Sequence, residues 1–281
     1  MVKELKSTDG TLIYAEATGD PSKPSVVFVH GFLLSGESFD NLFEDQKLLD
    51  KLYLVRYDVR SHGRSGKPQT MEGHASSLYA DDFKTVIEAF NLRRPVFCGW
   101  SLGGSTGADI CTYLDPIPLS GLVYMCAVPY LEPSVVEGTG RPDLRGLLTA
   151  VSTDGEVVDS INTRIKFMET LFKDHRSVPW KTKFSWMGSG VFMTPADCRF
   201  ALGRPQDGSK LLEAGRNGLP LLVIAAGDDE QLDGEGTVRT FAPHFKNMKV
   251  ARIANAGHAV HLDQQEEFVK TLIAFVLGEC H

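Results

Sequence analysis

The stretch from residue 96 to 104 constrains this chain more than any other part of its sequence. It reads Val-Phe-Cys-Gly-Trp-Ser-Leu-Gly-Gly, so an apolar run with strand character leads into the pattern G-x-S-x-G, and helix-forming residues follow. This order is typical of a nucleophile elbow, a tight strand-to-helix turn that holds a serine in a strained conformation. Gly99 and Gly103 flank Ser101 because side chains there would collide with the neighbouring strand and helix. The turn would also aim the first amides of the helix at an oxyanion beside the serine.

A serine hydroxyl must lose its proton as it attacks, so the sequence should also supply a base and a carboxylate that orients it. With this kind of elbow the chain order is Ser, then Asp or Glu, then His. The buried strand expected at 219–226 ends in three adjacent acids, Asp228, Asp229 and Glu230, and Asp233 follows closely. We favour Asp229 as the acid, with Glu230 and Asp228 as alternatives.

The base is predicted to be His258. It lies in a loop of small residues just after a short strand expected at 249–254, and Gly257 allows a sharp turn before it. His261 is the competing candidate three residues further on. The position and the chain order favour His258.

An oxyanion hole needs a second amide from another loop. The buried strand expected at 25–29 ends in His-Gly-Phe, where such a donor belongs. We therefore assign the backbone amides of Phe32 and Leu102 to the oxyanion hole. His30 could be mistaken for a base, but we expect its side chain to brace the loop.

Taken together, these motifs resemble those of the α/β-hydrolase superfamily, specifically its compact, cap-bearing esterase, haloperoxidase-like and epoxide-hydrolase-like branch. The resemblance spans nearly the whole chain and rests on five stretches: 27–32, 57–65, 99–104, 227–230 and 256–258. It implies an α/β fold with a mostly parallel eight-stranded sheet flanked by helices, and with a helical cap inserted after strand 6.

The residue at the elbow separates branches of this superfamily. Haloalkane dehalogenases and epoxide hydrolases that resemble this chain carry aspartate there, and dienelactone hydrolases usually carry cysteine, whereas this chain has Ser101. One departure from the family pattern Asp-x-Arg-Gly-His-Gly is Ser61, in a stretch that positions loops.

The order of expected elements predicts two parts of the chain. Strands at 26–29, 52–57 and 122–126 alternate with helices, such as the one expected at 76–90, which indicates a parallel sheet covered on both faces. The alternation stops from about 129 to 217. We therefore expect a hydrolase core of residues 1–128 and 218–281 and a helical cap of residues 129–217.

A cap of this kind excludes water and shapes the substrate pocket. Ligand sites are lined mainly by apolar and aromatic side chains. The candidate pocket residues are Trp100, His30, Trp180, Phe184, Trp186 and Met187. Basic residues of the cap could bind a carboxylate, although a solvated face is the favoured interpretation for Arg164, Lys166, Lys181 and Lys183.

Composition excludes several classes of function. The net charge of −7 and the lack of a basic stripe argue against nucleic acid as a partner. No apolar stretch approaches the ~20 residues that span a bilayer, and the polar N-terminus lacks a signal-peptide core, so we expect a cytoplasmic protein. The five cysteines include no C-x-x-C pair and are expected to be reduced, and we expect no metal and no cofactor.

The sequence thus predicts a serine hydrolase, similar to a carboxylesterase, whose partner is a small-molecule hydrophobic ester or lactone. Three alternatives use the same triad: hydrolysis of a C–C bond, cofactor-free perhydrolysis, and ligand perception by a receptor that hydrolyses slowly. The oligomeric state, monomer or homodimer, is left open.

Overall fold

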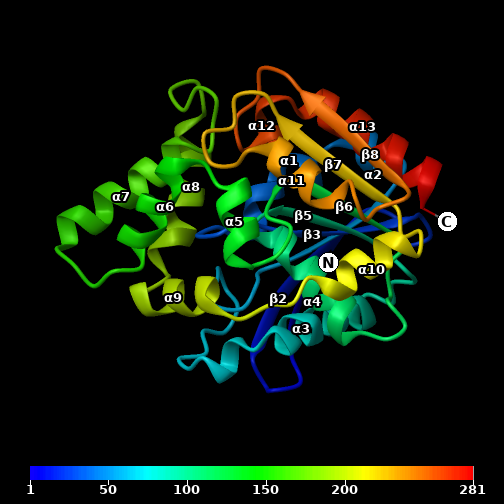
Figure 1. Ribbon diagram of the computed structural model, residues 1–281, viewed down its shortest axis with the longest axis horizontal. Coiled ribbons are helices and arrows are strands. Elements are labelled where there is room, and N and C mark those ends of the chain that lie inside the picture. Colours follow the sequence, from blue (N-terminus) through cyan, green and yellow to red (C-terminus); the bar gives the residue numbers. More distant parts are fainter. Residues whose placement is uncertain (281) are drawn as a thin grey trace.

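The computed structural model describes residues 1–280 and places eight strands in one sheet (Figure 1). The strand order is β1-β2-β4-β3-β5-β6-β7-β8. Strand β2 runs antiparallel to both of its neighbours, β1 and β4, and all other neighbouring strands are parallel. The strands are β1 (Val2–Lys6), β2 (Leu12–Thr18), β3 (Ser25–Val29), β4 (Tyr53–Tyr57), β5 (Val96–Ser101), β6 (Gly121–Ala127), β7 (Leu221–Ala226) and β8 (Met248–Ile253). The predicted hydrolase core ends at His281, and this residue lies outside the described residues.

Helices cover both faces of the sheet because its central strands are apolar on both sides. In β3, Val26 and Phe28 pack on one face and Val27 and Val29 on the other. The first face is covered by α1 (Asp40–Phe43), α2 (Gln46–Leu49) and α13 (Gln265–Glu279), and the second by α3 (Ser76–Ala89), α4 (Thr106–Tyr113), α10 (Ser209–Arg216) and α11 (Gly234–Phe241). The α/β-hydrolase fold expected from the sequence is confirmed.

The segment between β6 and β7 contains the helices that the broken alternation predicted. Figure 1 shows five of them gathered at one end of the sheet: α5 (Pro133–Thr139), α6 (Pro142–Val151), α7 (Val157–Glu169), α8 (Trp180–Val191) and α9 (Pro195–Gly203). The sixth, α10, instead packs beside α4, and its Leu211 and Ala214 belong to the core on the second face. The short elements η1 (Gly36–Phe39), η2 (Glu72–His74), η3 (Leu102–Ser105) and α12 (Val260–Asp263) lie in connections.

Among the described residues, no helix combines the length and the apolar character needed to cross a membrane. All five cysteines are free thiols in the structure.

Candidate active site

Ser101 ends β5, the strand that the sequence predicted to carry it. Its backbone has φ +56° and ψ −127°, a region that costs a non-glycine residue about 1–3 kcal/mol. The turn is tight enough that a Cβ on Gly99 would lie 2.6 Å from the Cα of Gly104, and one on Gly103 would strike the carbonyl oxygens of Val29 and His30. Glycine spacing in the sequence therefore reflects close backbone contact around a strained serine.

His258 and Asp229 come together in the loops after β8 and β7. The Nδ1 of His258 lies 2.8 Å from Oδ2 of Asp229, and both side chains are buried. The other carboxylate oxygen accepts backbone N–H groups of Gln231 and Leu232 at 2.8 and 2.9 Å. Because Nδ1–H donates to the carboxylate, Nε2 carries the lone pair, and it has no hydrogen-bond partner among residues 1–280. This is the tautomer a general base requires.

The competing residues lie elsewhere. Asp228 is exposed and pairs with Lys173 at 3.1 Å, and Glu230 is exposed as well. The carboxylate of Asp233 caps the N-terminus of α11 by accepting from Glu235 N. His261 is buried and places Nε2 2.9 Å from the carbonyl oxygen of Ser38.

The loop after β3 brings Gly31, the residue before Phe32, close to Ser101. A Cβ on Gly31 would lie 2.9 Å from that of Ser101. Among the described residues, neither the Phe32 amide nor the Leu102 amide donates a backbone hydrogen bond to the protein. Both amides therefore have no backbone acceptor within the described part of the protein.

His30 braces this loop, as expected, and is too enclosed to line a substrate pocket. Its Nδ1–H donates to the carbonyl of Gly31 at 2.8 Å, and its Nε2 accepts from the amide of Val59 at 3.0 Å. Burial lowers the pKa of His30 to about 4, so the ring is neutral near pH 7.

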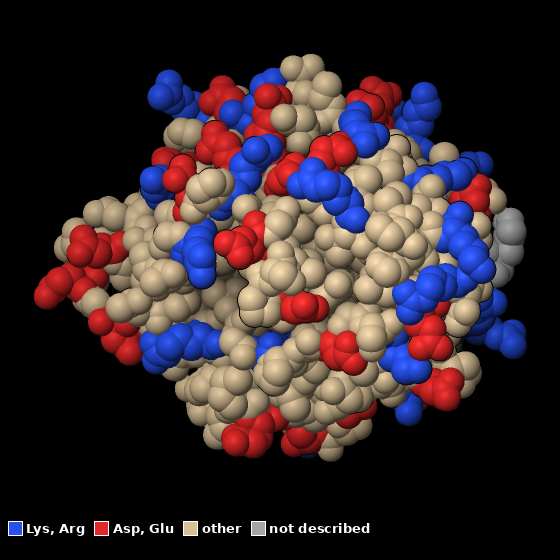
Figure 2. Space-filling view, viewed as in Figure 1, with Lys and Arg blue, Asp and Glu red and all other residues tan. Residues whose placement is uncertain are grey.

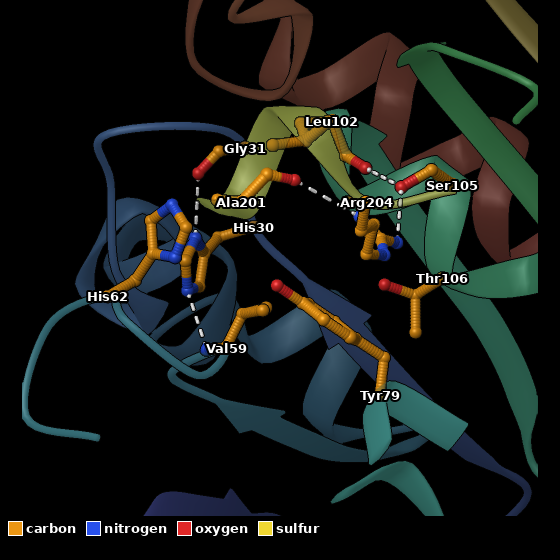
Figure 3. Close-up of a pocket in the computed structure, with 11 residues that line it drawn as sticks. His30, Gly31, Val59, His62, Tyr79, Leu102, Ser105, Thr106, Ala201 and Arg204 are labelled. Atoms are coloured by element: carbon orange, nitrogen blue, oxygen red, sulfur yellow. Dashed lines mark hydrogen bonds between the residues drawn. The ribbon is translucent and has the colours of Figure 1, made fainter. Parts of the chain in front are cut away.

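A small cavity lies between η3 and the loop after β3, and Leu102, Ser105, His30 and Gly31 are among the residues that line it (Figure 3). Its volume is about 10 Å³, which is about the least space that holds one water molecule. His30 and His62 line it on one side and Arg204 on the other, and the Nε2 of His62 and the Nε of Arg204 have no partner among the described residues. Burial, and to a lesser degree repulsion from His30, lowers the pKa of His62 to about 3.

Trp100 contacts the His258 loop instead of lining a pocket. Its indole is fully buried, and its Nε1–H donates to the carbonyl of His258 at 3.0 Å. The ring also packs against His261 at 4.6 Å between centroids and against Trp186 of α8 at 5.6 Å. No local pattern predicts this contact, because it joins residues 158 positions apart.

The four predicted pocket residues of α8 do not share one environment, because some are exposed and others pack on the core. Trp180 and Phe184 are 74% and 71% exposed, so neither lines a pocket in this structure. Trp186 is buried against Trp100 and Phe172, and the half-buried Met187 packs on the same core. Helical geometry explains the split, since Trp180 and Phe184 share one face and Trp186 lies on the opposite one.

The basic residues of the cap also differ from the expectation in one case. Arg164 is buried, and its guanidinium donates to the carbonyls of Gly190 and Met193 at 3.2 and 2.9 Å. It therefore holds the end of α8 and is not part of a solvated face.

The 57–65 stretch positions loops around the site. Both oxygens of the buried Asp58 accept backbone N–H groups, from Gly36 at 2.7 Å and from Arg64 at 2.8 Å. Ser61, where the family pattern has glycine, adopts φ +67°, and its hydroxyl lies 3.2 Å from Nε2 of His74. The left-handed turn is therefore kept without glycine.

An open cleft of about 990 Å³ lies between α5, α6 and α9, and sequence reasoning did not predict it. Figure 2 shows a hollow left of centre in this region, with basic side chains along its margin. Arg141, which lines the cleft, donates from Nε to the carbonyl of Asp229 at 2.8 Å. Arg204, which also lines it, pairs with the buried Asp109 at 2.7 Å and with Ser105 at 3.1 Å. None of the six predicted pocket residues lines this cleft, and neither does Ser101.

A mostly parallel sheet covered on both faces, with a strained serine at the end of β5 and a buried His–Asp pair after β7 and β8, defines the class of α/β hydrolases. The model of the alpha/beta hydrolase family matches residues 26–271. The chain therefore belongs to the alpha/beta hydrolase family.

Named relatives agree with this assignment. The chain is 26% identical to the bifunctional esterase/perhydrolase DCH of Acinetobacter calcoaceticus, over 97% of this chain and 98% of that protein. It is 36% identical to a non-heme chloroperoxidase of Streptomyces lividans over 142 residues, which is 50% of this chain and only 48% of the chloroperoxidase. The esterase RhEst1 from Rhodococcus sp. ECU1013 has the same fold, with a TM-score of 0.86 over 99% of each chain at 21% identity. Esterase and hydrolase relatives support hydrolase activity.

Proposed function

We propose that this protein is a serine hydrolase that cleaves a small to medium hydrophobic carboxylic ester or lactone through an acyl-enzyme. The proposal rests mainly on one arrangement: a strained Ser101 ends β5, and Asp229 holds the Nδ1 of His258, whose Nε2 has no hydrogen-bond partner among the described residues. A neutral imidazole in this tautomer can take a proton from a serine hydroxyl. Family membership supports the same chemistry.

In the proposed mechanism, Oγ of Ser101 attacks the carbonyl carbon while Nε2 of His258 takes its proton. The amides of Phe32 and Leu102 stabilise the oxyanion, and losing one such donor raises the barrier by roughly 3 kcal/mol. His258 then gives the proton to the leaving alcohol and activates a water molecule that hydrolyses the acyl-enzyme. Asp229 orients the imidazole throughout.

Within this proposal, residues 129–217 act as the cap, and the cleft between α5, α6 and α9 is the route of the substrate. Access requires such a route because Ser101 is only 9% exposed and His258 is fully buried. The cleft walls include Leu144, Leu148 and Leu202, which suit a hydrophobic ester.

Perhydrolysis is the second candidate, since one relative that matches almost the full chain is a bifunctional esterase/perhydrolase. In that reaction hydrogen peroxide replaces water at the acyl-enzyme, so the products are a peracid and free Ser101.

The test is hydrolysis of p-nitrophenyl esters from acetate to decanoate, with Ser101→Ala as the inactive variant. Ser120→Ala is the matched control, because Ser120 precedes β6 at the opposite end of the sheet. We expect turnover in the wild type and the control, and almost none in Ser101→Ala. Turnover that persists in Ser101→Ala refutes the mechanism. If Ser101 reacts with a fluorophosphonate but no ester is cleaved, C–C hydrolysis or a receptor role replaces the esterase proposal.

A further inference from the structure

The α8 helix carries an apolar face that no other described residue covers. Trp180, Phe184 and Val191 are 74%, 71% and 64% exposed, and Phe192 at the end of the helix is 69% exposed. The half-buried Met187 lies between them, so the stripe follows the whole length of the helix. Contiguous exposed apolar surface of this kind marks an interaction site more often than isolated side chains do.

The opposite face of α8 fixes the helix on the core. Ser189 contacts Ser35 at 2.9 Å between hydroxyl oxygens, and the hydroxyl of Ser185 donates to Glu37 at 2.9 Å. A Cβ on Gly190 would lie 3.1 Å from the carbonyl oxygen of Leu33. The exposed stripe is therefore the outer face of a helix seated next to the oxyanion loop.

The charge around this stripe is opposite to that of the whole protein. The chain has a net charge of −7, yet residues 171–193 contain four basic residues, Lys173, Arg176, Lys181 and Lys183, and one acidic residue, Asp174. Lys173 pairs with Asp228 at 3.1 Å, and the ammonium of Lys183 donates to the carbonyl of His175 at 3.0 Å. Of the four, Lys181 is the exposed one on α8 itself. The Nζ of Lys183 lies 5.5 Å from the ring centroid of Trp180.

The neighbouring helix α7 also exposes apolar residues, but the charged residues beside them differ from those on α8. Val157, Val158 and Ile161 are also at least half exposed, but the acidic residues Glu156 and Asp159 adjoin them. Only α8 combines exposed aromatic residues with basic ones and contains no acidic residue.

We propose that the outer face of α8 binds peripherally to the surface of an anionic phospholipid bilayer. Trp180, Phe184 and Phe192 would insert at the level of the headgroups, and the exposed Lys181 would contact the phosphates. A second copy of this chain fits less well, because two α8 helices face to face would bring their lysines together without an acidic partner.

The test measures co-sedimentation of the full-length protein with vesicles of phosphatidylcholine and phosphatidylglycerol in equal parts, without any ester. Trp180 provides a second readout, because Trp100 and Trp186 are already buried at 0% and 3% exposure. We expect the wild type to bind, its tryptophan emission to shift to the blue, and the binding to weaken as salt is added.

The variant Trp180→Ser/Phe184→Ser should weaken partition by roughly ten-fold for each aromatic removed. The control Val158→Ser/Ile161→Ser removes exposed apolar residues from α7 and should bind like the wild type. Thermal unfolding shows that both variants fold. Three results overturn the proposal: no binding of the wild type, equal loss in the control, or a dimer that the α8 variant converts to a monomer.

Discussion

Replacing His62 by asparagine tests whether buried neutral histidines control the stability of this protein in acid. The Nδ1–H of His62 donates to the carbonyl of Arg60 at 3.1 Å, and the amide of asparagine can keep that hydrogen bond. Protonation of the ring would add an N–H at Nε2, an atom that is buried without a partner among residues 1–280. The variant therefore removes the titration with little change in packing.

The sign of the effect follows from the direction of the pKa shift. The pKa of His62 is lowered from 6.5 in the unfolded chain to about 3 in the folded protein. Between these values the unfolded chain binds more protons, so the free energy of unfolding falls as the pH falls. At pH 5 the loss from His62 alone is about 2 kcal/mol.

Two other histidines act in the same direction, because burial also lowers the pKa of His30 and of His261 to about 4. At pH 5 each of them lowers the free energy of unfolding by a similar amount. The combined loss from the three histidines is therefore comparable with the ~5–15 kcal/mol free energy of unfolding of a typical domain.

The assay is urea unfolding of the wild type and His62→Asn at pH 7.5, 6 and 5. Between pH 7.5 and 5 we expect the wild type to lose about 2 kcal/mol more than the variant. Any constant cost of the substitution cancels in this comparison. Equal losses in the two proteins would refute the reasoning and show that His62 is protonated as readily in the folded state as in the unfolded chain.

Three further predictions concern the site. Asp229→Asn should lower kcat for a p-nitrophenyl ester on the order of 10⁴-fold, while Asp228→Asn should stay near the wild type; the reverse result would move the acid to Asp228. Trp100→Phe leaves the buried carbonyl of His258 without a donor, so urea unfolding should show a loss of about 1–3 kcal/mol. In the same variant kcat should fall while KM changes little, and a change confined to KM would instead make Trp100 a substrate contact. Gly103→Ala should lower the free energy of unfolding by about 1–3 kcal/mol, because the new methyl group meets the carbonyl oxygens of Val29 and His30. Thermal unfolding measures this loss, and an unchanged melting temperature would contradict the tight turn.

The sequence by itself was sufficient to predict the sheet, its covering helices and the turn around Ser101. These features depend on local rules: apolar runs form strands buried on both faces, a 3.6-residue period forms α3, and glycine spacing reports close backbone contact. The edge strand β1 had no predicted bounds, because its alternating pattern is short and half exposed.

Tertiary structure alone decided which side chains face one another. The acid loop offers three adjacent carboxylates, and only the backbone path after β7 turns Asp229 toward His258 while Asp228 remains in solvent. Along α8 the sequence shows a mixture of aromatic residues, and docking on the oxyanion loop buries Trp186 and exposes Trp180. The physical reason is that local patterns set the period of a helix or strand, whereas its orientation depends on contacts between residues far apart in the chain.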